Sequence, residues 1–125
     1  GATWTDLGST KNVPFPYSVE RWSEYSSDFG LTTAAPAWIW SQYRNYHIEG
    51  TVEALFNRVA KAKAWAVEHQ VPLVCNGFGV YDRSSTLEDR VAYLSALVDV
   101  FEELEIPWQH WYMIMNDSGV VASEY

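Results

Sequence analysis

The sequence has few of the residues that mark disulfide-rich, metal-binding or membrane-spanning proteins. Its 125 residues contain a single cysteine, Cys75, which excludes an internal disulfide. His47, His69 and His110 show no metal-ligand spacing, so we expect no metal site and no cofactor. No stretch approaches the roughly 20 apolar residues of a transmembrane helix, and no basic-then-apolar signal peptide is visible.

Basic side chains are also scarce. The chain has 8 Lys and Arg against 16 Asp and Glu, which gives a net charge of -8. Nucleic acids and anionic membrane surfaces attract basic proteins, so this balance argues against both as partners. An acidic chain of this kind is compatible with a neutral ligand.

Aromatic residues, by contrast, are abundant: 7 Trp, 8 Tyr and 5 Phe make up 16% of the chain. A flat apolar ring suits the C–H face of a sugar, but it equally suits a protein core. Core packing is the more common role for any single aromatic residue, and contact with a sugar remains the alternative.

Hydrophobic periodicity predicts two amphipathic helices, over residues 51–70 and 85–104. The second is expected to open with a capping box formed by Ser85 and Glu88. Its expected inner face consists of Leu87, Val91, Leu94, Val98 and Phe101, widened by Leu97 and Leu104. A less regular segment after Pro36 is also compatible with a helix, because proline suits a first helical turn.

Short apolar runs between these helices predict parallel strands at residues 1–5, 72–76 and 107–113. The alternation of strands and helices indicates an α/β fold built from βαβ units, with residues 1–125 as one domain. Parallel strands usually bury both faces, so something must cover them. Left alone, the strands of this chain are expected to present bare edges and an uncovered apolar face.

Several stretches resemble, in the right order, the C-terminal part of glycoside hydrolase family 5, the cellulase-type (β/α)8 barrels. Gly1–Trp4 resembles the end of the sixth strand of the family, and Ile106–Trp111 resembles the eighth. Val71–Tyr81 resembles the seventh strand and its following loop, and Arg90–Tyr93 falls in the next helix. The resemblance therefore implies a partial TIM barrel.

One departure from the family pattern concerns Gly77. The resemblance places the glutamate nucleophile of the family between Asn76 and Phe78, where this chain has Gly77. Retaining hydrolysis needs two carboxyl groups about 5–5.5 Å apart, and the resemblance places the second one in sequence upstream of this chain. We therefore expect this chain to be inactive alone. Asp82 and Asp117 are speculative substitutes, and the glycine is compatible with natural drift or with a deliberate change.

The resemblance also implies residues that contact substrate. Trp111 resembles the tryptophan beneath the sugar that is cleaved, and Trp4 resembles an aromatic residue at the rim. Asn76 and Asn116 complete the expected substrate-binding set. Trp108 lies an odd number of residues from Trp111 on an alternating strand, so we expect it to point into the core. The expected ligand is a β-glucan or a similar polysaccharide, and the expected location is secreted or periplasmic.

A complete barrel takes about 250 residues, whereas this chain offers three strands and opens on Gly1 rather than Met. We therefore expect either an upstream barrel segment as a partner or self-association, with repacking into a smaller α/β domain as a third outcome. Two further interpretations remain open: a non-catalytic glucan-binding module, and an interaction domain with no sugar function.

Overall fold

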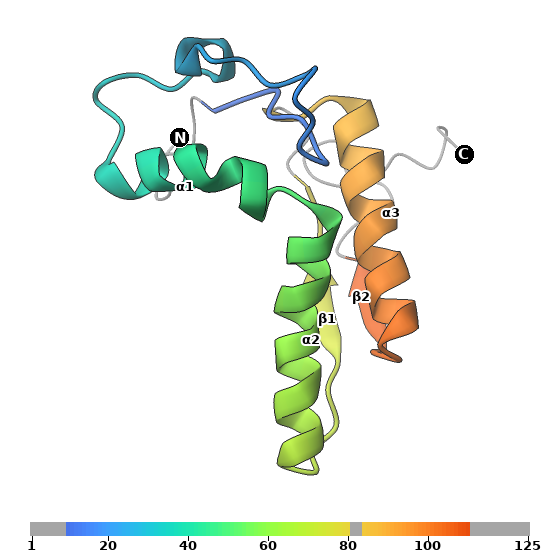
Figure 1. The fold of residues 1–125 in the computed structure, drawn as a ribbon. Helices are drawn as coiled ribbons and strands as arrows, with labels where there is room; N and C mark the ends of the chain where they lie inside the picture. Colours follow the sequence, from blue (N-terminus) through green and yellow to red (C-terminus); the bar gives the residue numbers. More distant parts are fainter. Residues whose placement is uncertain (1–9, 81–83, 111–125) are drawn as a thin grey trace.

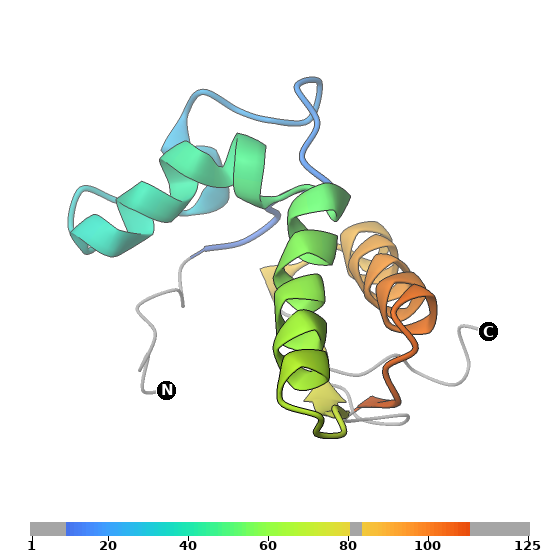
Figure 2. The ribbon, with the colours of Figure 1, turned by 60° about the horizontal axis from the view of Figure 1, so that its bottom comes forward.

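The computed structural model describes residues 10–80 and 84–110. In chain order these residues form a short 3-10 helix η1 (Ser26–Phe29), helices α1 (Ala37–Glu49) and α2 (Val52–Glu68), strand β1 (Cys75–Phe78), helix α3 (Leu87–Glu103) and strand β2 (Trp108–His110). Helices α2 and α3 pack against each other and lie on the same side of the strands, while α1 crosses near the start of α2 (Figures 1 and 2).

Strands β1 and β2 are parallel neighbours joined by α3, which makes them a βαβ unit. The predicted strand 72–76 is displaced toward the C-terminus, because the ladder begins only where the Cys75 N–H donates to Pro107 O at 2.9 Å. Of the predicted strand 107–113, the structure describes residues up to 110, and β2 covers Trp108–His110. The predicted strand 1–5 lies outside the described residues.

The main core lies between the strands and the two long helices. Its buried side chains are Phe78, Leu94, Leu97, Phe101 and Ile106, with Leu55 and Val59 of α2 packed against them. On the segment that enters β1, Leu73 and Cys75 face this core, whereas Val74 and Asn76 are exposed. In the described chain only the helix-facing side of this strand is packed, and the other side is uncovered, as expected for these strands left alone.

Both long helices follow their predicted ranges closely and end in the same way. Gln70 and Glu105 adopt left-handed conformations with φ of 53° and 51°. The next N–H groups, of Val71 and Ile106, donate back to Ala66 O and Phe101 O. These bonds are those of the Schellman motif, which satisfies carbonyl groups that the end of a helix leaves free. Each helix thereby turns directly into the segment that leads to the next strand.

The inner face of α3 differs from the predicted one at its start. Leu94, Leu97 and Phe101 are buried as predicted. Leu87 and Val91, however, are 46% and 40% exposed, and the first turn buries Asp89 and Arg90 instead. The helix therefore presents polar side chains to the interior where it meets the N-terminal segment.

Helix α1 and the N-terminal segment form a second, aromatic core. Phe29, Leu31 and Ile39 are buried there, and the Trp22 ring lies 5.2 Å from Tyr46 in a stacked arrangement. A Cβ at Gly50, between α1 and α2, would overlap the Tyr46 ring, so any larger residue here would have to displace that ring. These aromatic residues contact one another, which is the core role that we considered the more common one.

Candidate functional site

The carboxyl end of β1 is the place where the working groups of a βα fold are expected. Cys75 pairs with Trp108 and Phe78 pairs with His110, so β1 has one residue more than β2 between these pairs. This irregularity falls at Asn76 and Gly77, and such bulges are over-represented next to active sites because they redirect side chains. Glycine at this position leaves no side chain to redirect.

The structure places two of the predicted site residues, Gly77 and Asn76, together at this irregularity. Gly77 is half-buried and Asn76 is exposed. The other predicted contacts, Trp4, Trp111 and Asn116, lie outside the described residues, as do the candidate carboxylates Asp82 and Asp117. The expected site is therefore described only at its β1 portion.

Trp108 and His110 of β2 both pack against Phe78. Their ring centroids lie 5.6 Å and 5.2 Å from that of Phe78. Trp108 therefore contacts the core residue Phe78, but it is 39% exposed and so is not the buried core residue that we expected, and its indole N–H donates to Glu102 at 2.8 Å. His110 Nε2 and Arg90 Nε are buried without a hydrogen-bond partner in the part of the chain that the structure describes.

A buried carboxylate, Asp89, ties the start of α3 to the N-terminal segment. It is 3% exposed and accepts hydrogen bonds from Phe15 N–H at 2.9 Å and from the Thr86 hydroxyl at 2.6 Å. The Arg21 guanidinium lies 2.7 Å from the same carboxylate. Burial raises the pKa of Asp89, but the hydrogen bonds from Thr86, Phe15 and Arg21 outweigh burial and lower its pKa overall.

Sequence reasoning missed Asp89 because it placed the capping box one residue too early. The structure shows Thr86 at the N-cap, where its side chain accepts from the Asp89 N–H, so Ser85 is not the cap. Glu88 does not close the box either; it is exposed, and its nearest cation is Arg21 at 4.0 Å. The signal was available, since Thr86 and Asp89 have the same spacing as Ser85 and Glu88.

Hydrogen bonds to its backbone hold the segment before η1 across the ends of three helices. Asn12 N–H donates to Ser84 O at 2.8 Å, and Tyr17 N–H donates to Gly50 O at 2.7 Å. The Tyr46 hydroxyl donates to Pro14 O at 2.9 Å. Residues 12–17 therefore form a strap that connects the α1–α2 junction with the start of α3.

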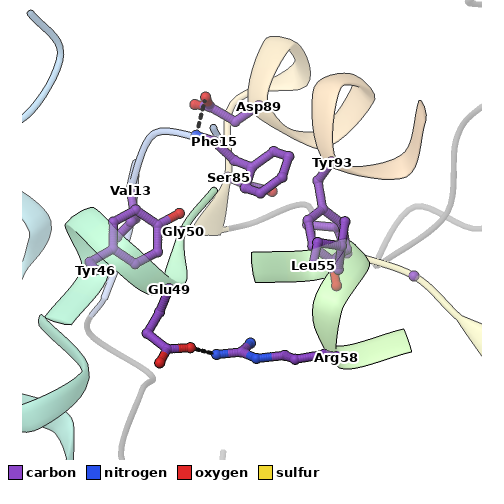
Figure 3. A pocket seen from close by; sticks show the side chains of 12 residues that line it. Val13, Phe15, Tyr46, Glu49, Gly50, Leu55, Arg58, Ser85, Asp89 and Tyr93 are labelled. Atoms are coloured by element: carbon purple, nitrogen blue, oxygen red, sulfur yellow. Dashed lines mark hydrogen bonds and ion pairs between the residues drawn. The ribbon is translucent and has the colours of Figure 1, made fainter. Parts of the chain in front are cut away.

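Beneath this strap lies a pocket of about 410 Å³ at the carboxyl end of β1 (Figure 3). Gly79 and Val80, which follow β1, line one part of it, and the strap and the three helices provide the rest. Burial, followed by the nearby Asp89 charge, raises the pKa of Tyr46 to about 12. Burial likewise raises the pKa of Tyr93, so both phenols in this pocket stay uncharged at neutral pH.

The described residues contain no cluster of His, Cys, Asp and Glu suited to a metal ion. Within residues 10–80 and 84–110, no helix has the length and apolar character needed to cross a membrane. His69 caps the end of α2 and stacks on Trp65 at 4.3 Å, which is a structural role. Cys75 is half-buried against the main core.

Comparison with solved structures gives the class of fold. The chain superposes on Thermotoga maritima Cel5A in complex with cellobiose with a TM-score of 0.53, at 21% identity over 87% of this chain and 31% of that one. Cel5A in complex with mannotriose gives a TM-score of 0.53 at 20% identity, over 88% of this chain and 31% of that one. The arrangement of helices and parallel strands is thus similar to part of a TIM-barrel cellulase.

Comparison of the sequence with those of known proteins identifies a relative. The chain is 38% identical over 120 residues to Endoglucanase 3 of Fibrobacter succinogenes, an alignment that covers 96% of this chain and 18% of the relative. No family model matches the chain. The predicted resemblance to cellulases is therefore confirmed as homology to an endoglucanase, and the chain spans only a small part of that relative.

Proposed function

We propose that this chain is the C-terminal segment of a cellulase-type (β/α)8 barrel that acts on a β-glucan. The observation that carries the proposal is the alignment with Endoglucanase 3 over 96% of the chain. Its βαβ unit, with β1 and β2 as the seventh and eighth barrel strands, supports the same assignment. An upstream barrel segment is the proposed partner, and a secreted or periplasmic location follows from the same resemblance.

We also propose that the chain alone does not hydrolyse glucan. Position 77, at the β1 irregularity, is where the nucleophilic carboxylate of such an enzyme would stand, and glycine supplies no nucleophile. The second carboxylate belongs to the proposed upstream segment. Trp4, Trp111, Asn76 and Asn116 are the proposed substrate contacts, and no cofactor is needed for chemistry between two carboxyl groups.

A second candidate is a non-catalytic glucan-binding domain derived from such a barrel. The aromatic-lined pocket at the carboxyl end of β1 favours it, because this pocket needs no upstream segment to form. Hydrolysis in a completed barrel distinguishes the two candidates.

The test is a chimera in which this chain replaces the 120 aligned residues of Endoglucanase 3. We expect the chimera to be inactive on an aryl cellobioside, and its Gly77→Glu variant to gain activity by a factor on the order of 10⁴, since loss of a nucleophile costs at least that much in other hydrolases. Initial rates of aryl-group release provide the measurement.

The matched control is Asn57→Glu, which adds the same carboxylate on the exposed surface of α2, away from β1. Circular dichroism establishes that each chimera is folded. A folded Gly77→Glu chimera that remains as inactive as the Asn57→Glu chimera would contradict the nucleophile assignment.

A further inference from the structure

The pocket beneath the strap combines aromatic walls with a charged pair. Figure 3 shows Asp89 at one end and the Glu49–Arg58 ion pair at the other, with the rings of Phe15, Tyr46 and Tyr93 between them. Its volume of about 410 Å³ falls within the roughly 300–1,000 Å³ that is typical of small-molecule sites. The residues that line the pocket come from the strap, from α1, α2 and α3, and from the segments that follow β1 and precede α3.

The two charged ends differ in what they offer a ligand. The Asp89 carboxylate already binds Phe15, Thr86 and Arg21. It therefore lines one end of the pocket but is not available to bind a ligand. Glu49 and Arg58 contact each other, yet their side chains are 41% and 59% exposed. A guanidinium has five N–H donors and a carboxylate has two acceptor oxygens, so this pair keeps donors and acceptors that no other residue within 10–80 and 84–110 uses.

The net charge at the Glu49–Arg58 end of the pocket determines which ligands can bind there. Glu49 and Arg58 neutralise each other, and both phenols nearby are uncharged, so the accessible part of the pocket has no net charge. An anion or a cation would lose hydration without gaining a counter-charge. A neutral ligand with adjacent hydroxyl groups, by contrast, matches the paired donors and acceptors.

The rings between the two ends favour a ligand that also has an apolar face. Phe15 and Tyr93 meet edge to face at 5.1 Å, which fixes both rings. Leu55 and Val80 add apolar contacts. A molecule with hydroxyl groups around its edge and C–H groups on its face satisfies both halves of this lining, and a pyranose has that structure.

We infer that this pocket is a binding site for a neutral sugar, of the size of one or two hexose units, held by Glu49 and Arg58 at its rim. The site lies on the helix-packed side of β1, under the strap. It deepens the second candidate function, on which it rests, by naming the site and the ligand, and sugar binding here requires neither a completed barrel nor a nucleophile.

The experiment titrates cellobiose into the 125-residue chain labelled with ¹⁵N, followed by amide and Arg Nε–H chemical shifts. We expect shifts at Gly50, Gly79 and the Arg58 side chain. Arg58→Gln should raise the apparent dissociation constant for cellobiose by at least about tenfold, which is a loss of about 1.4 kcal/mol of binding free energy. The ion pair is half-exposed, so the variant should remain folded.

The matched control is Lys61→Gln, which removes the same charge from an exposed position on α2 outside the pocket. Glu49→Gln is a second variant, which keeps the shape of the side chain and should also weaken binding. The inference is overturned if cellobiose gives no saturable shifts, if Lys61→Gln weakens binding as much as Arg58→Gln, or if inorganic phosphate binds the pocket more tightly than cellobiose.

These outcomes are independent of the hydrolysis test. Binding that depends on Arg58, together with an inactive Gly77→Glu chimera, would establish the pocket and refute the nucleophile assignment. If the Gly77→Glu chimera is active but the 125-residue chain alone binds no cellobiose, the nucleophile assignment is supported and the sugar-binding pocket is refuted.

Discussion

Asp89 links three parts of the chain through one carboxylate. Its partners are the strap at Phe15, the turn at Arg21 and the N-cap Thr86. A buried charge is costly unless it is fully paired, and here its hydrogen bonds lower its pKa despite burial. The carboxylate therefore stabilises the native state at neutral pH.

We expect Asp89→Asn to lower the free energy of unfolding by about 2 kcal/mol at pH 7, because hydrogen bonds to a charged acceptor are replaced by weaker ones. The native pKa lies below the unfolded value of about 3.9, so this contribution is full above that pH and disappears as the pH falls through the native pKa. Urea denaturation at pH 7 and at lower pH measures the difference.

Asp99→Asn is the matched control, since Asp99 is an exposed aspartate on the same helix. Its effect should stay within about 0.5 kcal/mol. A difference between Asp89→Asn and the native chain that grows on acidification would contradict the assigned direction of the pKa shift.

At the scale of elements, α3 shows how tertiary contacts select among apolar residues on one predicted face. Leu97 packs in the main core and is 5% exposed, whereas Leu87, in the first turn, is 46% exposed. The first turn instead faces the strap, where Asp89 needs hydrogen-bond donors. Helical periodicity alone gives both leucines the same role.

Leu97→Ala should therefore reduce the free energy of unfolding by roughly 2–5 kcal/mol, through lost burial and the cavity left behind. Leu87→Ala removes the same atoms from an exposed site and should cost less than about 1 kcal/mol. Thermal and urea unfolding followed by circular dichroism compares the two. Equal losses would mean that the first turn of α3 is packed in solution.

At the scale of the whole molecule, the strands have a packed side and an exposed side. Val74 is 61% exposed on the side opposite the main core, next to exposed Asn76. In the proposed barrel this side would face the interior. The helix-covered side is already complete in the described chain, because α2 and α3 both pack on it.

Val74→Asp should therefore change the stability of the isolated chain by no more than about 0.5 kcal/mol. In the Endoglucanase 3 chimera the same change should lower Tm by about 10 °C, because it buries an unpaired charge. Val67→Asp is the control, since Val67 is similarly exposed, at 65%, but lies on helix α2. If Val74→Asp leaves the Tm of the chimera unchanged, this side of β1 does not pack against the rest of a barrel.

The sequence by itself determined the two long helices, the parallel βαβ order and the homology to an endoglucanase. Helical periodicity over 51–70 and 85–104 is local, so it can be recognised without knowing which segments pack nearby. The similarity to the endoglucanase extends over 96% of the chain, so it can also be recognised in the sequence. Tertiary structure alone decided that Asp89 is buried against Phe15 and Arg21, that Leu87 is exposed, and that Glu49 meets Arg58 beside a pocket. Those outcomes depend on segments far apart in the chain, whose meeting is set by packing and by the pairing of buried polar groups.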